Sequence, residues 1–415
     1  MTLVFVASVV TTAFAIVGIL LVSVAGLLYL ILRRRGITYW IGTYICEASK
    51  RRQRALSGTS TENIHLLLCI ADHYEPRHGP VDAMRAMDRV HAWTEGYPRL
   101  LGGFRDSDGR PPRHTFFYPL EEYDAAEMDE IARLCRQGYG EVEVHLHHDH
   151  DTSENLRQRL LAYKTLLVER HGMLARRISD GQAMYGFVHG NWALDNSRPD
   201  GRWCGVNNEL DILRQTGCYA DFTMPSAPSD TQTRKINSIY HACDDPLRPK
   251  SHDWGVDVGT RPAPKDSLLM VQGPLVLDWG RRRMGIMPRV ENGCLQGNQP
   301  PDGHRVDPWL RAGIQVPSRP DWRFAKVYTH GAPEGNAAVL LGEETIRFHG
   351  QLAERARKNP RFHFHYLTAR EMYNLIRAAE AGFKGTVDEA RDFELVWNGA
   401  VGKPMGTRES LGTNS

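Results

Sequence analysis

The sequence predicts an α/β protein in which one N-terminal transmembrane helix precedes a mostly parallel sheet or barrel. Three observations lead to this fold class. Residues 2–32 carry no charged side chain and consist mainly of Leu, Val, Ile, Ala and Phe, as in a membrane-spanning helix. From residue 64 onward, apolar runs of strand length alternate with helical patterns, which is typical of parallel sheets. Polar residues that can carry chemistry follow directly after several of these strands.

The apolar N-terminal segment is predicted to span the membrane once. It exceeds the roughly 20 residues that a spanning helix needs and is too short for two spans. A cleaved signal peptide would begin with basic residues and have a shorter apolar stretch. Here the basic residues come after the segment, with seven Lys and Arg side chains between Arg33 and Arg54. The positive-inside rule then predicts an external N-terminus and a cytoplasmic domain.

The chain divides into four expected parts. Residues 1–35 form the transmembrane anchor, and residues 36–63 form a juxtamembrane linker that includes a short Ser/Thr/Gly stretch. Residues 64–380 form the α/β domain, and residues 381–415 form a C-terminal tail. No internal repeat is evident in the sequence.

Within the α/β domain, the elements follow one another along the chain as strand and helix patterns. The predicted strands are 64–71, 114–118, 141–147, 184–189, 219–224, 267–272, 324–330 and 362–367. The clearest helices between them are 124–137, 152–170, 206–216 and 343–357. Residues 225–265 and 280–322 are rich in Pro, Gly, Arg and Asp with little periodicity. Such long loops usually serve a site or a substrate.

Composition excludes some function classes. The formal net charge is +2, so there is no electrostatic case for binding nucleic acid. The seven cysteines are scattered and form no C-x-x-C pair, which speaks against a disulfide framework and favours a reducing compartment.

The most informative segment is residues 141–151, which read Glu-Val-Glu-Val-His-Leu-His-His-Asp-His-Asp. The run begins as a strand with one apolar face and one polar face, and the polar face carries His145 and His147. Two imidazoles at the end of a strand can bind one divalent ion, and nearby carboxylates can orient them. The alternative is a solvated polar loop without a fixed ligand. The polar face continues directly from a strand whose other face is apolar, and this favours a metal site over a solvated loop.

Other polar groups stand at the ends of further predicted strands. The first strand is followed by Asp72-His73-Tyr74-Glu75, the fourth by His189-Gly190-Asn191-Trp192 and the seventh by His330. Parallel sheets and barrels build their sites at the carboxyl ends of their strands. We therefore expect these groups to converge, although His330 by itself would more often be a structural residue.

In this order of motifs the chain resembles the polysaccharide deacetylases, over roughly residues 64–378. The end of the first strand, Cys69-Ile70-Ala71-Asp72-His73, occupies the place of the family's adjacent acids. Asp72 then resembles the general base, and His73 would replace the acidic metal ligand. The end of the seventh strand, Val327-Tyr328-Thr329-His330, resembles the strand that provides the family's general acid.

The second motif of that family is a pair of metal-binding histidines four residues apart. His145 matches the first of them, but position 149 is Asp. His147 or His148 would then take the second place, or Asp149 itself would be a ligand, and His150 also stays open. The family's Arg-x-Pro-x-Gly motif is replaced by the His189–Trp192 segment.

The resemblance implies a distorted barrel of seven or eight β/α units that binds a divalent ion, with zinc as the first candidate. It implies a metal-dependent hydrolase that removes N-acyl groups from a sugar or polysaccharide, with His189, Asn191 and Trp192 contacting the carbohydrate. The expected location is a single-pass protein of a bacterial inner membrane with a cytoplasmic catalytic domain, acting in surface glycan assembly.

Two other classes of function fit the same layout. A glycoside hydrolase would use two carboxyl groups, for which Glu75, Asp151, Asp195 and Asp221 are candidates. A non-catalytic glycan-binding protein could have kept the fold and lost the chemistry, as the histidine at position 73 and the missing arginine motif suggest. The density of histidines favours the metal-dependent enzyme.

Overall fold

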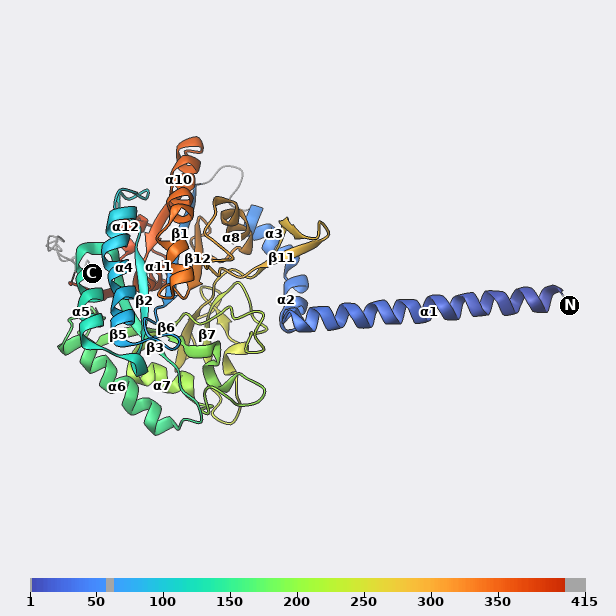
Figure 1. Ribbon diagram of the computed structural model, residues 1–415, viewed down its shortest axis with the longest axis horizontal. Helices are drawn as coiled ribbons and strands as arrows, with labels where there is room; N and C mark the ends of the chain where they lie inside the picture. The colour runs from blue at the N-terminus through green and yellow to red at the C-terminus, as the bar shows by residue number, and fades with distance from the viewer. Residues whose placement is uncertain (1, 57–62, 400–415) are drawn as a thin grey trace, which may run out of the picture.

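The central element of the fold is a large, mainly parallel β-sheet with helices around it (Figure 1). The structure is a computed structural model and describes residues 2–56 and 63–399. The hydrogen-bonded strand order is β12-β1-β2-β3-β5-β6-β9-β7-β8, and β13 also pairs with β1. The predicted mixed α/β fold with a large parallel sheet and one N-terminal apolar helix is confirmed.

The strands of the sheet follow the apolar runs of the sequence. They are β1 (Ile64–His73), β2 (His114–Pro119), β3 (Gly140–Leu146), β4 (Ala175–Arg177), β5 (Ala183–His189), β6 (Cys218–Asp221), β7 (Ile239–Cys243), β8 (Val256–Asp257), β9 (Ser267–Val271), β12 (Trp322–Thr329), β13 (Phe362–Leu367) and β14 (Leu395–Val396). The pairs from β12 through β1, β2, β3, β5 and β6 to β9 are parallel, whereas β7 pairs antiparallel with β9 and β8. Most residues of β1, β2 and β3 are buried, as in strands covered on both faces.

The helices after the strands provide the connections that parallel pairing requires. They are α4 (Ala83–Leu101), α5 (Ala125–Leu134), α6 (Ser153–Glu169), α7 (Glu209–Thr216), α8 (Val306–Ala312), α9 (Glu334–Leu340), α10 (Glu343–Lys358), α11 (Ala369–Glu380) and α12 (Val387–Ala390). The four helices expected most clearly are all present, within a few residues of their predicted ends.

Two regions differ from the expected loops and tail. Residues 225–265 contain β7 and β8, and the second long segment overlaps a hairpin of β10 (Val276–Arg283) and β11 (Met287–Glu291) and contains α8. β8 is only two residues long, and the outer half of β10 consists of Trp, Gly and Arg residues, so neither gave an apolar periodic signal. In the expected tail, α12 and β14 pack onto the domain, and β14 pairs with β4. Residues 400–415 lie outside the described residues.

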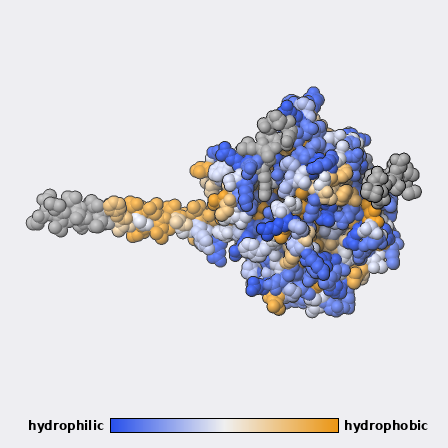
Figure 2. All heavy atoms as spheres, turned by 180° about the vertical axis from the view of Figure 1, so that it is seen from behind, coloured by the Kyte–Doolittle hydropathy of each residue, from blue (hydrophilic) through white to orange (hydrophobic). Residues whose placement is uncertain are grey.

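The N-terminal helix α1 (Thr2–Arg34) projects away from the domain (Figure 1). Its part from Phe14 to Arg34 is long and apolar enough to cross a membrane, and none of its most apolar stretch is buried. Seen from the opposite side, the coloured part of this helix is hydrophobic, whereas most of the surface of the body is hydrophilic (Figure 2).

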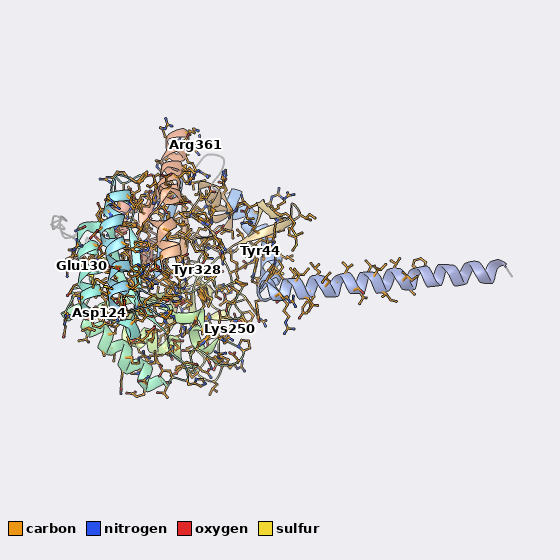
Figure 3. All side chains as sticks on the ribbon, viewed as in Figure 1. Tyr44, Asp124, Glu130, Lys250, Tyr328 and Arg361 are labelled. Atoms are coloured by element: carbon orange, nitrogen blue, oxygen red, sulfur yellow. The ribbon has the colours of Figure 1, made fainter. Side chains whose placement is uncertain are left out.

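The segment expected as a linker is helical in most of its described part and packs between α1 and the domain. It forms α2 (Ile41–Cys46) and α3 (Ala48–Leu56). Ile37 and Trp40 are buried in a small core with Ala227, Ile236 and Leu275. Tyr44, labelled in Figure 3 near the base of α1, accepts a hydrogen bond from the backbone N–H of Leu277. Residues 57–62 of the expected linker lie outside the described residues.

The buried side chain of Lys326 connects strand β12 with the chain that follows strand β6. The Lys326 ammonium on β12 donates to the backbone oxygens of Phe222 and Met224, each at 2.6 Å, just after β6. Burial lowers the pKa of Lys326 to about 7. Because a buried ammonium needs acceptors, these two bonds tie β12 to the chain that follows β6.

Candidate metal centres at the carboxyl ends of the strands

Four of the predicted site residues meet at one edge of the sheet. His73 ends β1, His145 lies near the end of β3, His147 follows it, and His330 follows β12. The ring centroids of His73 lie 4.9 Å from His145 and 4.6 Å from His330, and those of His145 and His147 lie 4.6 Å apart. The parallel register aligns the strand ends, which is why groups far apart in sequence converge here.

Glu75 completes this group, and the prediction did not include it among the metal ligands. Its Oε1 atom lies 3.2 Å from His145 Nε2, 3.7 Å from His147 Nε2 and 3.9 Å from His330 Nε2. Burial alone would raise the pKa of Glu75, but the hydrogen bond and charge of His145, with His330 and His147, lower it to about 2. We call His73, Glu75, His145, His147 and His330 the open cluster. Glu75 could have been predicted from the sequence, because it follows His73 by two positions and residues two apart in an extended chain lie on the same face.

The rings of His145 and His147 are oriented as in metal ligands. His145 Nδ1 bonds to the carbonyl oxygen of Val188 at 2.8 Å, and His147 Nδ1 to Glu121 Oε1 at 2.5 Å. Since these partners accept, the hydrogen of each ring lies on Nδ1, and Nε2, the atom near Glu75, is the position at which each ring could bind an ion. Such outer hydrogen bonds are the usual support of a metal-binding histidine. The ligand atoms of Glu75, His145 and His147 all lie within 4.8 Å of one another, so this trio fits a divalent ion.

The open cluster is accessible to solvent on one side. The side chains of His147 and His330 are 29% and 26% exposed, whereas His145 is fully buried. Burial, with the neighbouring His330 and His145, holds the pKa of His73 well below its usual value. Burial also lowers the pKa of His330, whereas Glu121 and Glu75 outweigh burial and raise that of His147.

Asp72 does not join the open cluster. Successive side chains of a strand point to opposite faces, so Asp72 points away from His73. Its Oδ2 atom bonds to His114 Nε2 at 2.8 Å, and its Oδ1 atom accepts the backbone N–H of Gly331 at 2.6 Å. Asp72 therefore fixes the backbone next to His330 rather than facing a substrate.

His148 and His189 form a second group, with two residues that the prediction did not name. Their Nε2 atoms lie 2.8 Å apart, and Glu209 Oε1 lies 3.2 Å from the first and 3.5 Å from the second. Cys204 Sγ lies 3.4 Å from Glu209 Oε2. All four residues are buried, and one ligand atom of each lies within 4.8 Å of the others. We call His148, His189, Cys204 and Glu209 the closed cluster, and it too could hold a metal ion.

The remaining candidates of the histidine run face outward. Asp149 and His150 are exposed and pair with each other, and Asp149 also accepts the backbone N–H of Trp203. Their side chains are thus separate from both clusters.

Trp192 lies beside the open cluster, whereas His189 belongs to the closed one. The Trp192 ring lies 5.9 Å from that of His73 and 5.7 Å from that of His330. It is half-buried, and its Nε1 atom has no partner among the described residues. Asn191, also half-buried, has a left-handed backbone with φ of 53°. This turn separates Trp192 from His189, so the two side chains reach different clusters.

No model of a known protein family matches this chain, and no curated protein matches it either.

Proposed function

We propose that the protein is a metal-dependent hydrolase that cleaves a C–N amide bond, removing an N-acyl group from a sugar or polysaccharide. The observation that supports it most is the open cluster, in which a buried carboxylate and imidazoles meet beside two partly exposed histidines. Catalytic metal sites have three protein ligands and an accessible position for substrate, and sites of two histidines and one glutamate are known among hydrolases.

In this proposal Glu75, His145 and His147 hold a divalent ion, with zinc as the first candidate because it accepts imidazole and carboxylate ligands. When bound, the ion supplies Lewis-acid chemistry: it acidifies water and polarises the amide carbonyl. Val188 and Glu121 keep the two histidine rings oriented through their hydrogen bonds.

The proton transfers are assigned to His330. Its Nε2 atom lies 3.9 Å from Glu75 Oε1, so it borders the proposed ion without bonding to the carboxylate. His330 would take a proton from the attacking water and donate a proton to the departing amine. The role of base expected for Asp72 is not part of this proposal, because its two oxygens already bond to His114 and Gly331.

Carbohydrate is the proposed substrate class because Trp192 stands next to His73 and His330. Aromatic rings suit the apolar faces of sugars.

A distorted (β/α) barrel of seven or eight units is the proposed form of the sheet. The hydrogen bonds of Lys326 to the chain after β6 support a barrel. They hold β12 close to a segment that is several strands away in the hydrogen-bonded order, as in a sheet that curves toward closure.

The glycoside hydrolase alternative is less well supported. Of the four carboxyl candidates, only Glu75 lies in the open cluster. Asp151 bonds to His148, Asp195 accepts the backbone N–H of Ser251, and Asp221 accepts from Thr223. A pair of free carboxyls facing one substrate is what that chemistry requires.

The experiment is to incubate the full chain, purified in detergent and supplied with zinc, with N-acetylated oligosaccharides and to measure acetate. Acetate release together with a new free amine is expected. Release of reducing sugar without acetate would instead indicate glycosidic cleavage. Binding of the oligosaccharide with no turnover would favour the non-catalytic glycan-binding protein.

The proposed location is a single-pass membrane protein with a cytoplasmic domain, in a bacterial inner membrane. Basic residues directly follow the span, and all seven cysteines are free, with Cys46 and Cys243 exposed. The β10–β11 hairpin projects on the side where α1 leaves the body (Figure 1). It exposes Trp279, Met284 and Ile286, a composition that suits a membrane interface.

Reporter fusions after residue 60 test this orientation. Alkaline phosphatase, which needs an oxidising compartment, is expected to be inactive there, and a green fluorescent protein fused at the same position is expected to be fluorescent. The opposite pair of results would place the domain outside the cytoplasm.

A further inference from the structure

Three of the four ligand atoms of the closed cluster have nearly the spacing of a tetrahedral metal site, and the cysteine sulfur lies within 4.8 Å of them. Ligand atoms about 2.1 Å from one ion, in tetrahedral geometry, lie about 3.4 Å from one another. In the closed cluster, the distances from Glu209 Oε1 to His148 Nε2 and His189 Nε2 are 3.2 and 3.5 Å. The two Nε2 atoms are 2.8 Å apart, and a shift of a few tenths of an ångström would seat both on one ion.

The hydrogen bonds on the far side of the two imidazoles leave the Nε2 atoms of His148 and His189 facing each other. His189 Nδ1 lies 2.5 Å from the carbonyl oxygen of Gly190, which can only accept, so the ring hydrogen is on Nδ1. His148 Nδ1 bonds in the same way to the Asp151 carboxylate at 3.1 Å. If both rings were neutral, each would direct an Nε2 lone pair at the other. Two such lone pairs at 2.8 Å repel, so either a metal ion or a proton lies between them.

Two backbone N–H groups point at the sulfur of Cys204, although burial and the charge of Glu209 raise the pKa of this thiol to about 11. Cys204 Sγ accepts the backbone N–H groups of Asn196 at 3.3 Å and Val206 at 3.4 Å. The second oxygen of Glu209 accepts the backbone N–H of Asp195 at 2.6 Å. Hydrogen bonds of this kind orient metal ligands from outside, so the outer contacts of all four ligands are in place.

We infer that the closed cluster is a separate structural zinc site with one Cys, two His and one Glu as ligands. Four ligands without an open position define a structural rather than a catalytic site, and thiolate with imidazole favours zinc over harder ions. This inference is independent of the proposed hydrolase activity. It differs from the open cluster, which has no cysteine and is partly exposed.

The zinc site would hold the chain that borders the open cluster. It links the ends of β3 and β5 to a loop residue and to the first residue of α7. Five residues between His189 and Glu209 have positive φ without being glycine: Asn191, Trp192, Asp195, Asn196 and Trp203. Such backbone persists only where its surroundings fix it. His147 of the open cluster and Trp192 beside it are within three residues of a zinc ligand, so the ion would keep them in place.

Cobalt substitution of the full chain tests the zinc site without any activity assay. The wild-type protein is freed of metal, loaded with Co²⁺ and examined for a near-ultraviolet thiolate-to-cobalt charge-transfer band. We expect this band in the wild type and in Cys218→Ser, whose cysteine is also buried but lies outside the cluster. We expect it to be lost in Cys204→Ser, together with one tightly bound zinc ion per chain.

The inference is overturned if folded, cobalt-loaded wild-type protein shows no thiolate band. Equal zinc content in the wild type and Cys204→Ser would also overturn it, and would indicate a proton shared by His148 and His189. Because the wild-type spectrum alone decides, a Cys204→Ser protein that fails to fold does not prevent the test. A His145→Ala variant should keep the band, which separates this ion from the proposed catalytic one.

Discussion

A His330→Ala variant is expected to release acetate about 10²- to 10⁴-fold more slowly than the wild type, the usual contribution of a general acid–base group. Its metal content should not change, because His330 is not among the three proposed ligands. Steady-state acetate release and metal analysis of the same preparation check both statements. The loss should fall on kcat, since the proton is transferred in the chemical step.

The matched control is His363→Ala. This histidine is half-buried on β13, near the amino ends of the strands, and stacks on His65. We expect its turnover to equal that of the wild type. If instead His330→Ala lowers the thermal midpoint and leaves turnover intact, His330 only stabilises the end of β12.

The largest effect on stability is expected from Glu291→Gln. The carboxylate of Glu291 pairs with the guanidinium of Arg305 through two bonds of 2.6 and 2.9 Å, and both side chains are buried. It also accepts from Trp309 Nε1, Arg281 Nη2 and the backbone N–H of Gly293. An amide cannot accept all of these bonds and leaves the arginine charge buried without its partner. Removing one member of a buried pair costs about 3–5 kcal/mol.

Equilibrium denaturation of the detergent-purified chain measures this loss in the free energy of unfolding. Glu354→Gln is the control, because Glu354 forms an exposed pair with Lys358 on α10. Exposed pairs contribute little, so its midpoint should stay close to that of the wild type. Equal midpoints for Glu291→Gln and Glu354→Gln would contradict the role given to the buried pair.

The strands were the most predictable part of the molecule. β1 and β3 were recognisable because their apolar runs are continuous or strictly alternating and end in polar residues. The hairpin of β10 and β11 was missed, since its exposed strand residues are Trp279, Gly280 and arginines and form no apolar alternation. Strands β1 and β12 pair although they are more than 250 residues apart. Nothing in the local sequence of either strand indicates which strand is its partner.

The candidate sites were only partly predictable. Strand alternation brought His145 and His147 into one group, and the same rule separates Asp72 from His73. The expected resemblance to deacetylases implied that the adjacent residues Asp72 and His73 act in one site. Their separation onto opposite faces of the strand was therefore not predicted. Cys204 and Glu209 come from a loop and a helix start, and their approach to His148 depends on tertiary structure that spacing alone does not encode.

The most direct test of the proposed catalytic centre is the dependence of acetate release on metal at the Glu75–His145–His147 group. Metal-free protein is titrated with zinc, and turnover and bound metal are measured together for the wild type and His145→Ala. We predict no turnover without metal, recovery in the wild type as the second ion binds, and no recovery in His145→Ala although it still binds one ion. Undiminished acetate release by metal-free protein, or by His145→Ala, would contradict the account.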